Sequence, residues 1–261
     1  MTENKDEKDR VKSLEKALGL LILLGDSSSS LSLDQLTQQA GLKKTSCFRL
    51  LRTMMRLGFV EQEAETKNYH LGSRNISIGA AALNSLSLRR TALPYMRELR
   101  KETGETVNLA ILEGTEIVFV ERLESEHILS THHKVGDRLP VHCTCMGKSL
   151  LAFLPEHKLN EVLSQIRFTR RTPRTITSRE AFLTELKKVR AQGLAVNVEE
   201  LEPGLGAVAG PIRNHRGEAV ASINIAFPTI RHDPKQAITR FAPKVKEACL
   251  AISRSLGFQE P

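Results

Sequence analysis

One segment near the amino terminus, AGLKKTSCFRLLRTMMRLGFV (residues 40–60), constrains the fold more than any other part of the chain. It contains five basic residues and no acidic one, and its apolar residues recur at helical spacing. This pattern predicts a helix from about residue 45 to residue 57, ended by Gly58. The residues expected to face a core are Phe48, Leu51, Met54 and Met55. The arginines fall on the other side, so one face of the helix is apolar and the other is uniformly positive.

The flanking sequence completes a winged helix-turn-helix over residues 13–73. A first helix is indicated at residues 13–24, and its expected packing residues are Leu14, Ala17, Leu18, Leu21 and Ile22. Ser32 and Gln35 form a capping-box pattern at the start of a short second helix, which ends at Gly41. Two short strands with a polar connection then form a β wing.

A helix with these properties, in this motif, lies in the major groove of double-stranded DNA. Thr45, Ser46 and Arg49 occupy its first turns, the part that meets base edges, and we expect Arg49 to be the main base contact. The expected phosphate contacts are Lys43, Lys44, Arg52 and Arg56, with Lys67 at the tip of the wing. The same basic face would also fit a solvated surface, but the turn and the wing favour DNA.

The rest of the chain changes character. Residues 1–12 are charged and aperiodic, which is typical of a flexible arm. Residues 74–92 are rich in Ala, Leu and Ser and predict a linker helix. Residues 93–258 alternate between strand-like and helical patterns, which predicts an α+β domain with room for a pocket.

Composition excludes several classes of protein. The net charge of +8 permits a polyanionic partner without requiring one, and four cysteines in 261 residues do not form a disulfide scaffold. The charged start lacks the apolar region of a signal peptide, and the longest apolar run, LGLLILLG, is too short to span a membrane. We therefore expect a cytoplasmic protein without a membrane partner.

Catalytic motifs are missing from the sequence. It contains neither G-x-S-x-G nor a phosphate-binding G-x₄-GK[ST] loop. The neighbouring carboxylates Glu199 and Glu200 would point to opposite faces of a strand. We expect no enzyme activity and no cofactor.

Across residues 13–257 the chain resembles the IclR-type (isocitrate-lyase-regulator) family of transcriptional regulators. The matching segments include SLEKALGLL, LTQQAGLKKTSCFRLLRTM, ETGETVNLAILEG, GDRLPVHCTCMGKSLLAFLP and EELEPGLGAVAGPI. The resemblance implies a winged helix-turn-helix joined by a linker helix to a GAF-like effector domain. It also implies a homodimer or tetramer that binds palindromic operators near catabolic genes, most often as a repressor.

The resemblance further implies an effector pocket. Its residues in this chain would be Leu139, Cys145, Met146, Asn197, Leu205, Ala207, Asn224 and Ala226. Gly206 and Ala207 stand where many members have Arg and Cys, and Asn197 stands where Asp is common, so we expect a different effector from that of the best-known members. The segments RTITS and FPTIR are similar to the sugar-acid-responsive branch, which implies a carboxylate or sugar acid.

Two alternatives stay open at this point. The first is a metal-responsive regulator, because soft ligands are dense in one short segment. The residues concerned are His132, His133, His142, Cys143 and Cys145. The Cys-x-Cys spacing is not the usual C-x₂-C, and the sequence has no second paired motif. The second alternative is a constitutive DNA-binding protein with a non-functional pocket.

Overall fold

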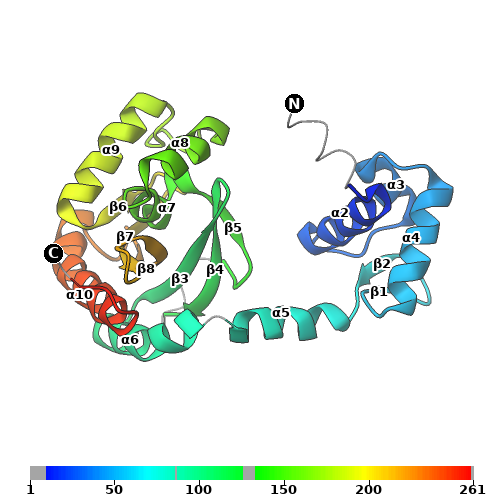
Figure 1. The fold of residues 1–261 in the computed structure, drawn as a ribbon, viewed down its shortest axis with the longest axis horizontal. Coiled ribbons are helices and arrows are strands. Elements are labelled where there is room, and N and C mark those ends of the chain that lie inside the picture. Colours follow the sequence, from blue (N-terminus) through cyan, green and yellow to red (C-terminus); the bar gives the residue numbers. More distant parts are fainter. Residues whose placement is uncertain (1–9, 86, 126–132, 260–261) are drawn as a thin grey trace. The chain divides into compact units, whose positions relative to one another are not determined.

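The computed structural model describes residues 10–85, 87–125 and 133–259. The chain divides into two compact units, an N-terminal unit of residues 1–85 and a C-terminal unit of residues 86–261 (Figure 1). Each unit is described by itself. Most of the expected arm lies outside the described residues, and Lys12 already belongs to the first described helix.

The N-terminal unit is a winged helix-turn-helix, as predicted. Its elements are α2 (Lys12–Asp26), α3 (Leu33–Ala40), α4 (Lys44–Arg56), β1 (Val60–Gln62), β2 (Tyr69–Leu71) and α5 (Arg74–Ser85). The predicted capping box is present, since Ser32 Oγ accepts from the Gln35 backbone N–H and the Gln35 side chain accepts from the Ser32 N–H. Gly41 ends α3 in the left-handed conformation, with φ of 62°, which lets the chain turn into α4.

The buried face of α4 differs by one residue from the prediction. Cys47, Leu51 and Met54 are buried, at positions i, i+4 and i+7, whereas Phe48 is 43% exposed. The expectation that Phe48 faces the core is therefore wrong, because Cys47 takes that place in the packing. Phe48 instead lies beneath the Arg52 guanidinium, 5.9 Å from its carbon to the ring centre.

The first helix also buries a different face from the one predicted. Leu20 and Leu24 of α2 are buried in the core with Leu36 and Leu51. Leu14, Leu18 and Ile22, which were expected to pack inside, are 50–63% exposed together with Val11. These four residues follow one another at spacings of three, four and four, so they form one line that begins at the N-cap residue Val11 and continues along the surface of α2. We call them the apolar stripe.

The wing is an antiparallel hairpin of β1 and β2, in which Glu61 pairs with His70. A backbone bridge between Leu31 and Tyr69 joins this hairpin to the segment before α3. Lys67 lies in the connection between the two strands and has a φ of 60°, which is uncommon for a residue with a side chain. Its side chain is exposed.

The predicted linker region, residues 74–92, falls in two helices of the structure. α5 belongs to the N-terminal unit, and α6 (Ser87–Thr103) belongs to the C-terminal unit. The expected boundary at residue 93 lies inside α6. Residue 86, between the two helices, is outside the described residues.

The C-terminal unit is the predicted α+β domain. Its strands are β3 (Thr106–Glu113), β4 (Glu116–Leu123), β5 (Arg138–Pro140), β6 (Ala195–Val198), β7 (Leu205–Arg213) and β8 (Ala219–Pro228). They form one antiparallel sheet in the order β5-β4-β3-β8-β7-β6. The remaining helices are α7 (Cys145–Leu151), α8 (Glu156–Gln165), α9 (Arg179–Gln192) and α10 (Pro234–Ser255).

Helices cover both faces of this sheet (Figure 1). α6 and α10 pack on one face and on each other, and α7 packs on the other face, with α9 against α7. A short 3₁₀ helix, Val141–Cys143, leads from β5 into α7. The start of α7 therefore faces the middle of the sheet. The GAF-like classification stays a prediction.

Within the described part of the chain, no helix combines the length and the apolar character that crossing a membrane requires.

Candidate DNA-binding surface and effector pocket

The predicted DNA-contact residues all lie on the surface of the N-terminal unit. Lys43 is the N-cap residue of α4, six of the others lie within α4, and Lys67 lies in the wing. The set is exposed throughout: Lys43, Lys44, Thr45, Ser46, Arg49, Arg52, Arg56 and Lys67. Cys47, Leu51 and Met54 hold the opposite side of α4 in the core, which fixes the direction in which the basic face points.

Lys44 has an acidic neighbour within the unit. Its Nζ lies 2.6 Å from Asp34 Oδ1 in the first turn of α3, and both side chains are more than 60% exposed. Exposed pairs of this kind contribute little to stability and are readily exchanged for another anion. The pair therefore leaves Lys44 able to contact a phosphate group.

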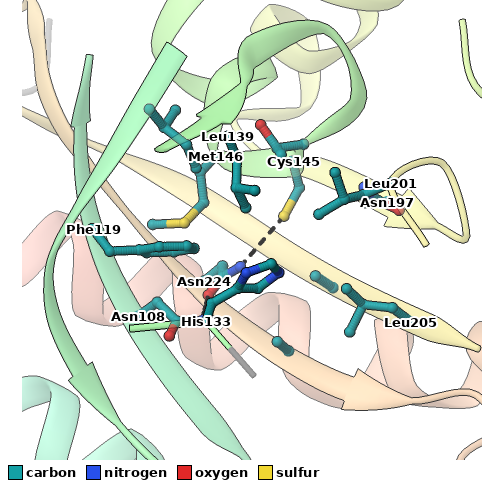
Figure 2. Close-up of a pocket in the computed structure, with 14 residues that line it drawn as sticks. Asn108, Phe119, His133, Leu139, Cys145, Met146, Asn197, Leu201, Leu205 and Asn224 are labelled. Atoms are coloured by element: carbon teal, nitrogen blue, oxygen red, sulfur yellow. Dashed lines mark hydrogen bonds between the residues drawn. The ribbon is translucent and has the colours of Figure 1, made fainter. Parts of the chain in front are cut away.

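The predicted effector residues meet in the C-terminal unit. A cavity lies between the sheet and the start of α7 (Figure 2), and its empty volume, including space open to solvent, is about 370 Å³. All eight predicted residues line it: Leu139, Cys145, Met146, Asn197, Leu205, Ala207, Asn224 and Ala226. Their role as effector contacts stays a prediction.

Six further lining residues were missed by sequence reasoning: Asn108, Ile117, Phe119, His133, Thr144 and Leu201. Asn108 gave a signal, since it is a polar residue within the otherwise apolar strand segment VNLAIL and is 2% exposed. The ring of His133 stacks on Phe119, with ring centres 5.7 Å apart, and so forms part of the wall. None of the described residues that line the cavity is acidic.

Asn197 lines the cavity but uses both ends of its amide on the backbone. Nδ2 donates to the Cys143 carbonyl at 2.6 Å, and Oδ1 accepts from the Glu200 N–H at 3.0 Å. Its primary effect is to tie the segment before α7 to the loop after β6.

The loop of residues 199–204 places Leu201 in the cavity, and side-chain hydroxyls hold this loop in place. Thr172 Oγ1 donates to the Glu199 carbonyl and Thr175 Oγ1 to the Glu200 carbonyl, at 2.6 and 2.7 Å. Thr229 Oγ1 donates to the Glu199 carboxylate at 3.0 Å. Thr175 and Thr229 belong to the RTITS and FPTIR segments, neither of which lines the cavity. These segments therefore contact the loop that carries Leu201 and do not contact the cavity directly.

Lys148 of α7 is fully buried and was not singled out by the sequence. Its Nζ donates to the Val196 carbonyl and to Glu200 Oε1, both at 2.6 Å, and lies 3.5 Å from Glu185 Oε1. Burial raises the pKa of Glu200, and the Lys148 ammonium opposes that rise. The ammonium thus joins α7, which carries Cys145, to the strand β6, which carries Asn197.

The structure does not support the metal-site alternative. His132 lies outside the described residues, and no group of three or more potential metal ligands occurs in the part that is described. His142 Nε2 is 3.0 Å from the Thr169 carbonyl, so it is a hydrogen-bond donor there. Burial raises the pKa values of Cys143 and Cys145 to about 11, which keeps both as thiols rather than thiolates.

The buried His142 predicts how stability depends on pH. Burial lowers its pKa below the ordinary value, so the unfolded chain takes up a proton near pH 6.5 that the folded chain refuses. Its contribution is constant above pH 6.5, and stability falls as pH is lowered below that value. We expect thermal unfolding of His142→Gln to change less between pH 7.5 and pH 5.5 than that of the wild type. His157→Gln, on the surface, is the matched control and should behave as the wild type.

The fold and the two sites define a class of protein. A winged helix-turn-helix with an exposed basic helix is present in the same chain as an α+β unit with a cavity. This combination is that of a transcriptional regulator.

Comparison with known proteins names the family. A model of the IclR helix-turn-helix domain matches residues 13–64, and a model of the bacterial transcriptional regulator IclR C-terminal domain matches residues 80–254. The chain belongs to the IclR family of bacterial transcriptional regulators, whose members are regulators rather than enzymes.

Two relatives come from Escherichia coli K12. The HTH-type transcriptional regulator XynR is 35% identical, over 95% of this chain and 98% of its own length. The HTH-type transcriptional regulator KdgR is 34% identical, over 97% of this chain and 95% of its own length. Among solved structures, an IclR homologue from Microbacterium hydrocarbonoxydans complexed with 4-hydroxybenzoate has a TM-score of 0.80 at 26% identity, covering 94% of this chain and 98% of its own.

Proposed function

We propose that this protein represses catabolic genes by binding a palindromic operator, and that a small organic acid or sugar acid releases it. The observation that carries the proposal is the uniformly basic, exposed face of α4 on a winged helix-turn-helix. Among the ion pairs described for this helix, the only acidic partner is Asp34, and its pair with Lys44 is exposed. A surface of this kind matches the charge of a DNA groove.

On DNA, the residues of the basic face divide into base contacts and phosphate contacts. Thr45, Ser46 and Arg49 reach base edges in the major groove, and Arg49 forms a bidentate contact with a guanine. The phosphate contacts are Lys43, Lys44, Arg52 and Arg56, and Lys67 on the wing contacts the backbone or the minor groove. Sequence preference then depends mainly on Arg49.

The lining of the cavity supports a small acid as effector. Its described residues combine apolar walls with asparagine amides and no carboxylate, as binding sites for small molecules often do. The related protein from M. hydrocarbonoxydans carries an aromatic acid, 4-hydroxybenzoate. The Thr175 and Thr229 segments, similar to those of the sugar-acid-responsive branch, hold one wall of the cavity.

A second copy of the chain covers the apolar stripe. Val11, Leu14, Leu18 and Ile22 expose a continuous line of large apolar side chains on α2, which is unfavourable in water. A palindromic operator presents two half-sites about 34 Å apart, which requires two N-terminal units related by a twofold axis. Burial of the stripe against its copy joins these units in the homodimer or tetramer.

Regulation then follows from a shift between two arrangements of the dimer. The effector stabilises one arrangement, and the spacing of the two α4 helices in that arrangement no longer matches the half-sites. A ligand without preference for one arrangement would leave DNA binding unchanged.

Arg49 and Lys44 should differ in what they contribute to DNA binding. Arg49→Ala should cost about 1–3 kcal/mol on the specific operator and weaken the preference over random DNA. Lys44→Ala should weaken binding to both DNAs by a similar factor and reduce the slope of log affinity against log salt by about 1. Fluorescence anisotropy with the two DNAs at several salt concentrations measures both effects. Equal losses on the two DNAs for Arg49→Ala would contradict this assignment.

A gel shift at fixed salt tests the function as a whole. The DNA is the region upstream of the protein's own gene, and the added compounds are a panel of sugar acids and aromatic acids. Specific retardation that one acid releases is the expected result. Specific retardation that no compound changes would instead support a constitutive regulator, and weak retardation of every DNA would refute the operator-binding proposal.

A further inference from the structure

A row of polar side chains crosses the sheet next to the cavity. Arg122 on β4 pairs directly with Asn108 on β3, and Asn108 pairs directly with Asn224 on β8. Directly paired residues project their side chains to the same face of a sheet. The row is buried, since Asn108 and Asn224 are 2% and 7% exposed and the Arg122 side chain is 4% exposed.

The arginine fixes the direction of every hydrogen bond in this row. A guanidinium group can only donate, so Arg122 Nη1 must meet the oxygen of Asn108, at 2.9 Å. The amide nitrogen of Asn108 consequently points the other way and donates to Asn224 Oδ1 at 2.8 Å. Asn224 therefore has its oxygen engaged and its Nδ2 directed into the cavity.

At the cavity, Asn224 Nδ2 meets a weak partner. It lies 3.7 Å from the sulfur of Cys145, as the dashed line in Figure 2 shows. A thiol is a poor hydrogen-bond acceptor, so an oxygen atom of a ligand is a better partner for the N–H groups of this amide. Arg122, which also pairs with the exposed Glu124, adds positive charge behind the row.

We propose that Arg122 is a positioning residue for the effector site: through Asn108 it turns the Asn224 amide so that the cavity offers a hydrogen-bond donor, and this donor receives the carboxylate of the effector. The effector carboxylate lies at Asn224 and Cys145, and its carbon skeleton extends along Leu139 and Leu205. This inference rests on the proposed function, because it specifies how the same cavity selects acids over neutral compounds of the same shape.

The test compares three acids with their amides on the full-length protein. The probes are acetate, D-gluconate and 4-hydroxybenzoate, against acetamide, gluconamide and 4-hydroxybenzamide. NMR of the asparagine side-chain amides, with Asn224 assigned from an Asn224→Asp sample, follows binding at the proposed donor. We expect at least one acid to shift the Asn224 resonance saturably and to bind about tenfold or more tightly than its amide. If no acid shifts this resonance, the proposal is wrong.

Three variants separate positioning from simple charge. Arg122→Lys keeps a group that only donates and should keep the preference for the acid. Arg122→Gln can donate or accept, so the preference should fall about tenfold. Asn108→Leu keeps the charge of Arg122 but removes the link, and it should also lose the preference. Retention of the wild-type preference by Asn108→Leu would show that the charge acts through space and would overturn the positioning role.

Melting curves establish that each variant is folded before binding is compared. If Asn108→Leu does not fold, Arg122→Lys is compared with Arg122→Gln instead. An equal preference of these two variants for the acid over its amide would overturn the proposal. Retardation of the operator in the gel shift above, without added acid, is independent of this test because it reports DNA binding alone. If the protein binds its operator but no acid shifts the Asn224 amide resonance, this inference is wrong and the DNA-binding function is unaffected.

Discussion

Lys148→Met should lower the free energy of unfolding of the C-terminal unit by about 3–5 kcal/mol. Lys148 is fully buried, and its ammonium forms the close contact with Glu200 Oε1 and the hydrogen bond to the Val196 carbonyl. Methionine fills a similar volume but leaves Glu200, whose side chain is 12% exposed, without its counter-charge. Removing one partner of a buried pair costs more than the pair itself contributes, since the remaining charge stays desolvated.

Urea unfolding of the full chain, followed by hydrogen exchange of peptides from β7 and β8, reports on this unit alone. Lys188→Met is the matched control, because Lys188 pairs with Glu185 but its side chain is 63% exposed; its effect should stay within about 0.5 kcal/mol. The double variant Lys148→Met with Glu200→Gln removes the unpaired charge and should recover at least about 1 kcal/mol relative to Lys148→Met. A loss below 1 kcal/mol for Lys148→Met would mean that Glu200 is neutral or solvated in the folded protein.

The second large effect concerns the apolar stripe. Leu18→Glu places a carboxylate in the middle of the line formed by Leu14, Leu18 and Ile22, where the proposed second copy packs. Burying that charge against its own copy is strongly unfavourable. We expect affinity for a palindromic operator to fall at least about 100-fold, because the two half-sites are no longer bound together. Affinity for a single half-site should not change.

Titration of both DNAs by fluorescence anisotropy measures this difference. Ile230→Glu is the control, since Ile230 is an 86% exposed apolar residue of the C-terminal unit, and it should bind as the wild type does. Equal losses on the palindrome and on the half-site would indicate that the substitution perturbs α4 rather than the contact between copies. Wild-type affinity for the palindrome would exclude the stripe as that contact.

Sequence reasoning succeeded where the signals are local. The cap at Ser32, the helix end at Gly41 and the hairpin around Lys67 all depend on neighbouring residues. The structure confirms these three predictions. It failed on which apolar face of α2 is buried, because the helical pattern marks every apolar position alike. Leu18 and Leu20 look equivalent in the sequence, but one is exposed and the other is in the core.

The cavity shows a second limit of sequence reasoning. The eight predicted lining residues came from the family resemblance, and the structure brings them to one place. Phe119 and His133 were missed because strand register and loop position bring them there, and neither follows from local pattern. Asn108 stands out as a polar residue in an apolar strand, but that signal does not show that its side chain lines a cavity. Lys148 was missed because a lysine is expected at the surface unless its partners are known.

The threonines that hold the loop of residues 199–204 have a consequence for the history of this protein. Thr172, Thr175 and Thr229 fix the shape of one cavity wall without lining the cavity themselves. Residues such as Ala207 and Ala226 line it through small side chains. The shape of the cavity and its surface chemistry therefore depend on different residues. A lineage can change the molecule it senses by replacing the lining residues, while the threonines preserve the shape of the wall.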